Sequence, residues 1–238
     1  MREKFTKSPR IVVLTGAGIS AESGISTFRD QDGLWEKHDI MDVATPEGWR
    51  RNPSLVLEFY NQRRKQLNEV LPNAAHFALA KLQKYFHVDV ITQNVDDLHE
   101  RAGAKNVMHL HGELRKVRSE KIPSLIYNTK HWEVKLGDTC EKGHQLRPHI
   151  VWFGEDVPLI SVAAELVEKA DVILVIGTSL NVYPAAGLLF HAQYNARKIL
   201  IDPNEMQVEN VFQLQHYKEK AGEAVPRVVD ELIQEFSR

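Results

Sequence analysis

The stretch GAGISAESGISTFRD at residues 16–30 decides the fold, and it follows directly on the apolar run IVVLT at residues 11–15. An apolar run that leads into a glycine turn is typical of a β-strand that brings the backbone to a phosphate group. Gly16 and Gly18 can adopt positive φ and allow a diphosphate to approach closely. Ser20 and the residues after it offer N–H donors at the start of a helix. Read as G-x-G-x-x-A, the stretch predicts dinucleotide binding, and the alternative is a tight turn without a ligand.

Length and composition favour one α/β domain. The chain has 238 residues, of which 43% are hydrophobic, enough for a sizeable core and a smaller inserted module. Its formal net charge of −2 argues against direct binding of nucleic acid, because no broad basic field is available for the phosphates. Residues 1–10 are charged and lack the apolar core of a signal peptide, and no apolar run reaches membrane-spanning length. We therefore expect a cytoplasmic protein with no membrane partner.

Strands alternate with helices along the chain, which predicts a fold of the α/β class. Further strands are expected at residues 88–92, 107–114, 150–155, 172–176 and 198–202, and later helices at about 161–169, 188–194 and 226–236. The predicted architecture is a Rossmann-like, doubly wound parallel sheet with a smaller lobe formed by two insertions. We expect one catalytic domain over residues 1–238, with a large lobe at 1–37, 72–115 and 147–238, a small lobe at 38–71 and 116–146, and a cleft between them.

The opening stretch departs from the fingerprint of a dehydrogenase after Ala21. A second glycine turn at Gly24 and the sequence TFRD at 27–30 come before any second strand. The acidic residue that binds ribose about 20 residues after the glycines is therefore missing. Hydride transfer is disfavoured, and a reductase ranks behind the functions considered below.

Five short motifs occur in a fixed order: GAGIS at 16–20, FRD at 28–30, TQNVDDLH at 92–99, HLHG at 109–112 and GTSL at 177–180. Together they resemble the sirtuin family, and the resemblance runs from about Arg10 to Val228. It implies an NAD-dependent lysine deacylase that yields nicotinamide, O-acyl-ADP-ribose and free lysine. NAD is the implied cofactor, and acylated lysine side chains of proteins are the implied partners.

The resemblance also implies the roles of individual residues. His111 matches the family's general base, a role that suits an imidazole titrating near neutral pH. Gln93 and Asn94 match residues that bind ribose hydroxyls, and Asn94 is also assigned to catalysis. Asp96 matches the acceptor of the nicotinamide carboxamide. His109 receives no role.

The cofactor-binding set follows from the same resemblance. Phe28 matches a residue that shields the reactive C1′ face, and Arg29 matches one that orders the cofactor loop. Asp202 stands where sirtuins usually have an asparagine that contacts the adenosine ribose. The whole set is Gly16, Ala17, Gly18, Ser20, Ala21, Phe28, Arg29, Trp35, Gln93, Asn94, Val95, Asp96, Gly177, Thr178, Ser179, Asp202, Asn204 and Ala221.

The segment VWFG at 151–154 matches the family's substrate segment, whose backbone pairs with the peptide and whose apolar side chains line the acyl-lysine tunnel. Ala44, Tyr60 and Arg63 resemble class III sirtuins, in which a small alanine widens the acyl pocket and a tyrosine and an arginine bind an acidic tail. Arg63 can pair with a succinyl or malonyl carboxylate, and Tyr60 adds an O–H donor one helical turn away. On spacing alone, the alternative is a helix-face tyrosine and a solvated arginine. The predicted substrate set is Ala44, Tyr60, Arg63, Val151, Trp152, Phe153 and Gly154.

Most sirtuins carry two Cys-x-x-Cys pairs in the inserted lobe, whereas Cys140 is the single cysteine of this chain. One cysteine excludes an intramolecular disulfide and a four-cysteine zinc site. We expect no metal and a lobe held by the packing of Leu125, Ile126, Tyr127, Trp132 and Val134. The alternative is a metal site formed by Cys140 and His144 with His131 or His149.

Two other functions stay open at this point. A mono-ADP-ribosyltransferase would keep the NAD chemistry and transfer ADP-ribose to a protein side chain. A non-catalytic NAD or ADP-ribose sensor would bind the nucleotide without turnover. His111 and the set of Ala44, Tyr60 and Arg63 favour a desuccinylase and demalonylase that also deacetylates, and we expect it to be a monomer.

Overall fold

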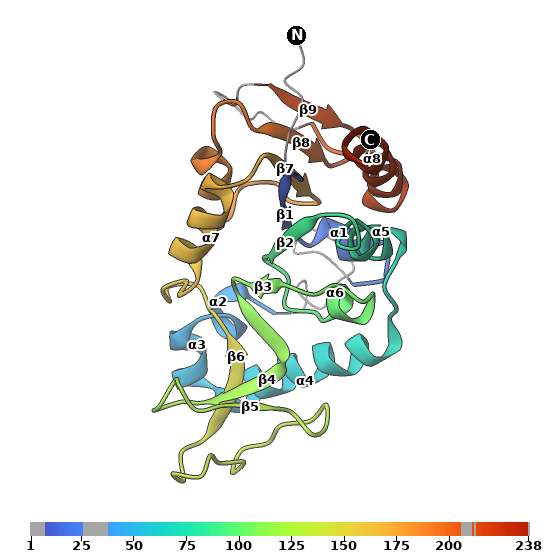
Figure 1. The fold of residues 1–238 in the computed structure, drawn as a ribbon. Coiled ribbons are helices and arrows are strands. Elements are labelled where there is room, and N and C mark those ends of the chain that lie inside the picture. The colour runs from blue at the N-terminus through green and yellow to red at the C-terminus, as the bar shows by residue number, and fades with distance from the viewer. Residues whose placement is uncertain (1–7, 26–37, 206–210, 212, 238) are drawn as a thin grey trace.

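The computed structural model describes residues 8–25, 38–205, 211 and 213–237, and the predicted α/β fold is confirmed. Within that part of the chain, two sheets occupy the upper and lower halves of the molecule in Figure 1. The larger sheet has six strands in the order β3-β2-β1-β7-β8-β9, and each neighbouring pair is parallel. These strands are β1 (Arg10–Thr15), β2 (His87–Thr92), β3 (Val107–His109), β7 (Val172–Ile176), β8 (Arg197–Ile201) and β9 (Leu214–Tyr217).

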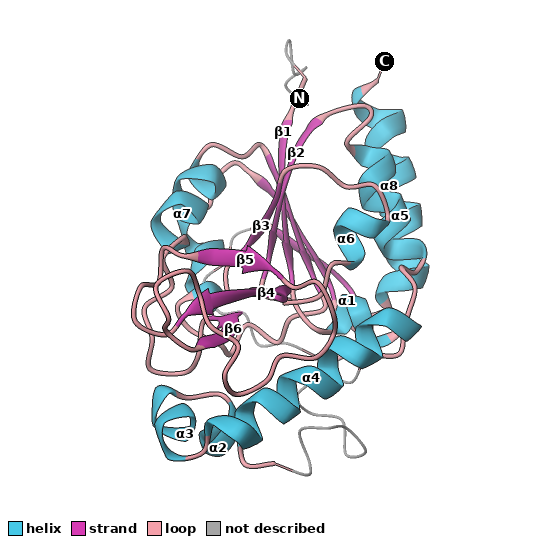
Figure 2. Ribbon diagram, turned by 90° about the horizontal axis from the view of Figure 1, so that it is seen from below, coloured by secondary structure: helices cyan, strands magenta, loops and turns pink. Residues whose placement is uncertain are grey.

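Helices cover both faces of this sheet (Figure 2). Ile11 and Val13 of β1 pack with α5 (Ala74–Leu82) and α8 (Ala221–Phe236), whereas Val12 and Leu14 pack with α7 (Ile160–Glu168) and the 3-10 helix η1 (Ala185–His191). A strand that is covered on both faces needs apolar side chains at successive positions. This explains why β1 and β7 appear in the sequence as continuous apolar runs.

The strand order puts a topological switch point between β1 and β7. From β1 the chain adds β2 and β3 on one side, and later β7, β8 and β9 on the other. The pairing register aligns the last residues of five strands, which are His109, Thr92, Thr15, Ile176 and Ile201. Open α/β sheets bind ligands outside the carboxyl ends of their strands at such a point. The residues that directly follow these strands therefore occupy the expected ligand position.

The smaller sheet is antiparallel and has the order β5-β4-β6 in the described residues. Its strands are β4 (Gly112–Ser119), β5 (Ile126–Asn128) and β6 (Leu146–Ile150). It packs with three helices, α2 (Ile40–Val43), α3 (Pro46–Arg51) and α4 (Pro53–Glu69). The helix α4 begins where the Asn52 side chain accepts a hydrogen bond from Leu55 N (3.1 Å), with Pro53 in the first turn. The predicted lobe limits stay predictions, and β4 spans one of them.

The structure corrects several predicted elements. The strand predicted at 107–114 is two strands in two different sheets, because Gly112 with φ of 82° turns the chain between them. The strand predicted at 150–155 is wrong, since β6 ends at Ile150 and a turn follows, closed by a hydrogen bond from Glu155 N to Trp152 O (3.0 Å). The sequence pattern does not predict β9. The helix α8 begins at Ala221 and not at the predicted residue 226, and the 3-10 helix η1 occupies 185–191 where a helix is predicted at 188–194.

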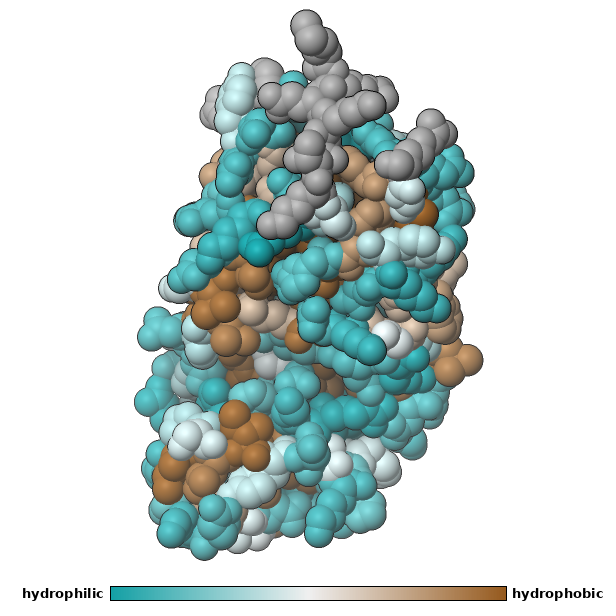
Figure 3. Space-filling view, in the orientation of Figure 1, coloured by the Kyte–Doolittle hydropathy of each residue, from teal (hydrophilic) through white to brown (hydrophobic). Residues whose placement is uncertain are grey.

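The outer surface is mixed in polarity. In Figure 3 the visible face is largely hydrophilic, with scattered apolar areas. Among the helices of the described residues, none combines the length and apolar character needed to cross a bilayer.

Candidate active site

Three of the predicted motifs meet at the carboxyl edge of the parallel sheet. Gly16 follows β1, Gln93 follows β2 and Gly177 follows β7. Each of these residues donates its backbone N–H to the last carbonyl of a neighbouring strand, at 3.0 Å for Gly16, 2.9 Å for Gln93 and 2.9 Å for Gly177. The sheet ladder therefore continues for one residue beyond the strands and holds the three loops side by side.

The glycine loop after β1 packs against the loop after β7. A Cβ atom on Gly16 would lie 2.6 Å from Thr178 Cβ, and one on Gly18 would lie 2.7 Å from Gly177 Cα. The positive φ predicted for Gly16 and Gly18 is wrong, because the left-handed residue at this junction is Gly177, with φ of 60°. Close approach of two backbones, and not a left-handed conformation, therefore requires glycine at 16 and 18.

The short helix α1 (Gly18–Ala21) directs its N–H groups into the protein. Ile19 N donates to Gly16 O (3.2 Å), and Ser20 N donates to Ala17 O (3.1 Å). The Ser20 N–H therefore has a partner within the loop, and its predicted contact with a phosphate stays a prediction. Ser20 is 1% exposed, and its hydroxyl donates to Asp96 Oδ2 (3.0 Å), so it joins two loops of the site.

Asn94 and Gln93 connect the β2 loop to both glycine loops. Asn94 Nδ2 donates to Gly16 O (3.0 Å) and lies 3.2 Å from Ser20 Oγ. Gln93 Nε2 donates to Thr178 Oγ1 (3.1 Å). Both amides keep their carbonyl oxygens as acceptors, which suits them to receive hydroxyl protons.

Asp96 is a buried carboxylate at the same edge, with 4% exposure. Besides the Ser20 hydroxyl, Leu98 N donates to its Oδ1 (3.1 Å). Burial raises the pKa of Asp96, and these two hydrogen bonds act in the opposite direction. The carboxylate thus has spare lone pairs for an N–H donor of a ligand.

His111 lies between β3 and β4, where the chain passes from one sheet to the other. Its Nδ1 is 3.1 Å from Gln93 O. A carbonyl can only accept, so Nδ1 carries the proton and Nε2 is the basic nitrogen. Burial lowers the pKa of His111, while the bond to Gln93 opposes that shift. The ring is therefore neutral at pH 7 and can accept a proton at Nε2.

The outer part of the predicted cofactor set lies after β8 and at the start of α8. Asp202 accepts hydrogen bonds at one oxygen from Asn204 N (2.9 Å) and Asn204 Nδ2 (3.0 Å), so the two side chains pair with each other. Ala221 is the first residue of α8, and the next N–H, of Gly222, donates to Glu22 Oε2 (2.6 Å). Four more predicted residues lie on loops or helix ends at this edge: Ala17, Ala21, Val95 and Ser179. Outside the described residues are Phe28, Arg29 and Trp35.

The predicted substrate segment is attached on both sides. Val151 N donates to His111 O (2.9 Å), and Phe153 N donates to Ala44 O (3.0 Å). Between them, Trp152 N donates to the carboxylate of Glu155 (2.8 Å). Because the N–H groups of 151–153 are engaged within the protein, a peptide strand paired with these three residues has only their carbonyls to use.

Tyr60 and Arg63 lie one turn apart on α4, in the smaller lobe. Tyr60 is 2% exposed, and its hydroxyl accepts a hydrogen bond from Trp152 Nε1 (3.0 Å). Burial raises the pKa of Tyr60 to about 12. Arg63 is half-buried; burial lowers its pKa, and the nearby Tyr60 and Asp96 oppose that shift. Tyr60 is therefore a buried residue and not one exposed on the helix face, while the role of the pair in binding an acyl tail stays a prediction.

Comparison with known proteins identifies the family of this constellation. Residues 16–184 match the model of the Sir2 family. The chain belongs to the Sir2 family, the sirtuins. It is 56% identical over 226 residues to an NAD-dependent protein deacylase of Helicobacter pylori, and the aligned region covers 94% of this chain and 97% of that relative. It resembles the structure of a mutant Sir2 homologue with ADP-ribose (TM-score 0.88, 39% identity, 100% and 98% of the two chains) and that of a Sir2 homologue with NAD (TM-score 0.87, 39% identity, 98% and 93%).

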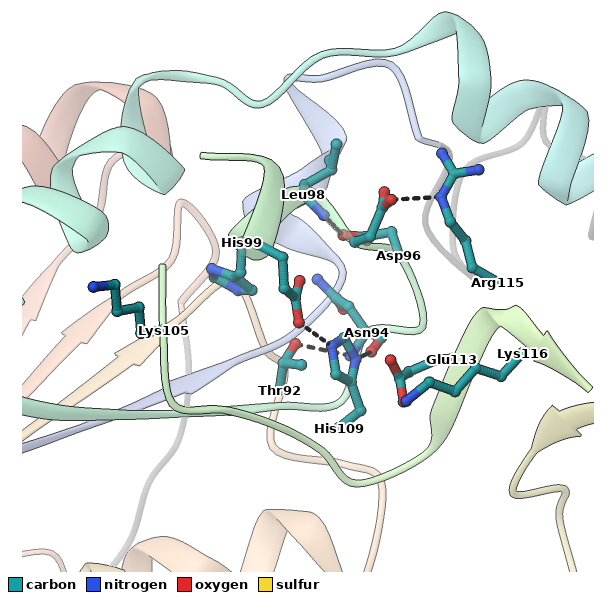
Figure 4. Close-up of polar contacts among 12 residues, drawn as sticks. Thr92, Asn94, Asp96, Leu98, His99, Lys105, His109, Glu113, Arg115 and Lys116 are labelled. Carbon is teal, nitrogen blue, oxygen red and sulfur yellow. Dashed lines mark hydrogen bonds and ion pairs between the residues drawn. The ribbon is translucent and has the colours of Figure 1, made fainter. Parts of the chain in front are cut away.

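His109, to which the sequence assigned no role, contacts the loop of Asn94 in this sirtuin. His109 Nδ1 lies 2.8 Å from Asn94 O (Figure 4). Its Nε2 lies 2.8 Å from Glu100 Oε1. Burial acts to lower the pKa of His109, but Glu100 and the Asn94 carbonyl outweigh it and raise that pKa. The signal in the sequence is the spacing HLHG, which puts a second histidine two residues before His111.

The inserted lobe of the sirtuin contains a tight turn at its single cysteine. Cys140 is buried, and its N–H donates to His144 O (2.9 Å). Among the described residues, no group of three or more His, Cys, Asp or Glu side chains lies close enough to hold a metal ion. Of the predicted packing residues, Val134 is buried and Tyr127 packs against the same apolar cluster, whereas Ile126 at 44% and Trp132 at 41% are exposed, so the predicted packing is confirmed only in part.

A buried arginine also holds this lobe to α4. Arg64 has no exposed surface, and it donates to Trp132 O (2.7 Å) and to Asn61 Oδ1 (2.6 Å). Asn61 in turn bonds both N and O of Val134, at 2.9 and 3.0 Å. Burial lowers the pKa of Arg64 to about 10. The sequence reasoning missed this arginine because neighbouring Arg63 and Lys65 make the run look like a solvated basic face.

Proposed function

We propose that this sirtuin removes succinyl and malonyl groups, and also acetyl groups, from lysine side chains of proteins. The coarser function is that of its family: it is an NAD-dependent protein deacylase with NAD as its cofactor. One observation carries the finer proposal. Tyr60 presents a buried hydroxyl one helical turn from Arg63, and both lie on the helix that packs beside Ala44.

The pocket chemistry favours an acidic acyl tail. Arg63 supplies a cation at a half-buried position, where a charge-assisted pair with a carboxylate is stronger than in bulk water. Tyr60 adds a neutral donor that stays protonated at physiological pH. Ala44 contributes a single methyl group, which leaves room for a longer tail than acetyl. An acetyl group still fits the same space, so deacetylation persists.

The described residues at the carboxyl edge fit NAD. They combine amide groups at Gln93 and Asn94, a hydroxyl at Thr178 and a buried carboxylate at Asp96, which match ribose hydroxyls and a carboxamide. When bound, NAD supplies the C1′ carbon that takes the acyl oxygen as nicotinamide leaves.

His111 performs the proton transfer in this proposal. Its Nδ1–H is held by Gln93 O, so Nε2 is free of a proton and can take one from a ribose hydroxyl. The Val151 N–H bond to His111 O keeps the base next to the substrate segment. The proposed base and the predicted substrate segment are therefore joined by a backbone hydrogen bond.

The decisive experiment measures nicotinamide release and deacylated product with acetyl-, succinyl- and malonyl-lysine peptides of one sequence. Arg63→Met should lower kcat/KM for succinyl and malonyl peptides roughly 10- to 100-fold, the value of a hydrogen bond to a charged group, and lower that for the acetyl peptide far less. Lys65→Met is the matched control, because Lys65 is an exposed cation on the same helix. Equal losses on all three peptides in Arg63→Met would refute the carboxylate role.

The same assay separates the alternative functions. Mass spectrometry that finds ADP-ribose on a protein side chain would indicate a mono-ADP-ribosyltransferase. NAD binding without nicotinamide release on any acyl peptide would indicate a sensor. A cytoplasmic, monomeric enzyme remains the prediction made from the sequence.

A further inference from the structure

A partly buried carboxylate, that of Glu155, connects the strands and the turn that pack behind Tyr60. Glu155 accepts from Arg118 Nη2 at 2.9 Å, from Arg147 Nη1 at 2.8 Å and from Trp152 N at 2.8 Å. Gly154, with φ of 88°, makes the turn that brings this carboxylate back onto Trp152 N. The two arginines come from β4 and β6, so Glu155 fixes the substrate segment to both strands.

The guanidinium of Arg147 holds the plane of the Trp152 indole. Its Cζ lies 3.4 Å from the centre of the Trp152 ring, a stacking distance, while Nη2 donates to Ile150 O (3.0 Å). Arg147 is 7% exposed and Trp152 is 2% exposed, so water does not compete for either. A cation stacked in this way fixes the ring and leaves its N–H edge pointing in one direction.

That N–H edge points at Tyr60. An indole N–H can only donate, so the Tyr60 oxygen is the acceptor of the 3.0 Å bond. One lone pair of the hydroxyl is thereby occupied, and its own proton is directed away from the indole. Because burial keeps the phenol protonated, with a pKa of about 12, that proton is available to a ligand.

We propose that Glu155 and Arg147 are positioning residues that act through Trp152 to orient the Tyr60 hydroxyl as a hydrogen-bond donor to the carboxylate of the acyl tail. This inference rests on the proposed preference for succinyl and malonyl groups, and it names the residues that set that preference from behind the pocket. A carboxylate accepts a hydrogen bond, so a fixed donor selects it, whereas the methyl group of an acetyl tail makes no such bond.

The test is a double-mutant cycle on succinyl- and acetyl-lysine peptides. Trp152→Phe keeps the aromatic ring and removes the N–H, and it should raise KM for the succinyl peptide about tenfold, with a smaller effect on kcat and on the acetyl peptide. In a Tyr60→Phe background the same change should shift the succinyl-to-acetyl ratio less than about twofold, because the donor is already gone. Glu155→Gln, which keeps the shape of the side chain, should give the effect of Trp152→Phe in weaker form.

A second readout follows the indole directly. The Trp152 Nε1–H proton signal should exchange faster with solvent in Glu155→Gln than in wild type, and thermal unfolding should verify that each variant is folded. An unchanged acyl ratio in Trp152→Phe, or an equal shift with and without Tyr60, would overturn the inference. If the wild type shows no preference for succinyl peptides but the effects of Trp152→Phe and Tyr60→Phe are still coupled, only the proposed function is overturned. If the wild type shows the preference but the two effects are independent, only this inference is overturned.

Discussion

His109 and His111 are two residues apart, yet their surroundings shift their pKa values in opposite directions. His111 faces one backbone carbonyl, and burial lowers its pKa. His109 faces a backbone carbonyl at one nitrogen and the Glu100 carboxylate at the other, and its pKa is raised. Both partners of His109 accept, so both of its nitrogens carry protons.

The difference suits His111 to the proposed role of base and His109 to the role of a support. A neutral imidazole with a free Nε2 can take a proton, whereas an imidazolium bonded at both nitrogens cannot. His109 instead holds the Asn94 carbonyl, and Asn94 holds Gly16 O through its amide. This difference supports the proposal that His111 is the catalytic base and that His109 fixes the loop of Asn94.

Removal of the base should have the largest effect. His111→Ala should lower kcat roughly 10²- to 10⁴-fold, the usual contribution of a positioned general base, with little change in thermal stability. Steady-state deacylation and circular dichroism check this. A loss of less than tenfold would indicate that another group takes the proton.

Removal of the support should cost less and act on the cofactor. His109→Gln should lower kcat/KM for NAD roughly tenfold, mainly through KM, because the Asn94 loop loses a charged donor. His87→Gln is the control, since His87 also lies near a carboxylate, Asp89, but is 61% exposed and far along β2 from the site. A kcat loss in His109→Gln as deep as that of His111→Ala would contradict the division of roles.

The acid limb of the pH profile should report His111 alone. Because burial lowers its pKa, kcat should stay level through neutral pH and fall only below the ordinary histidine value of about 6.5, as the ring takes a proton. The limb should persist in His109→Gln. A midpoint above pH 7 in pH-rate measurements would contradict the burial effect.

The position of His111 at the sheet edge was predictable and the partners of His109 were not, for a physical reason. Ordered strands followed by GAGIS, TQNVD, HLHG and GTSL are local patterns, and parallel strands bring such ends together at one edge. The Glu100 partner of His109, the Arg64 bonds to residues 132–134 and the Glu155 network depend on side chains that meet only after folding. The glycine positions illustrate both cases, since the residues were identified but the cause was contact with Gly177 and not positive φ.

The smallest effect concerns the ion pair behind the support. Glu100 is 41% exposed on its side chain, so Glu100→Gln should lower the free energy of unfolding by only about 1 kcal/mol and activity only a few-fold. Because the pKa of His109 is raised in the folded protein, its charge contributes stability that is fully present below the pKa of the unfolded chain and is lost as pH rises through the folded pKa. Because the pKa of Glu100 is lowered, its charge contributes stability that is fully present above the pKa of Glu100 in the unfolded chain. The pair is therefore complete between about pH 5 and 6. Urea unfolding of wild type and Glu100→Gln should show this difference in the free energy of unfolding near pH 5.5 and a smaller difference near pH 9. An equal difference at the two pH values would mean that Glu100 acts by its shape and not by its charge.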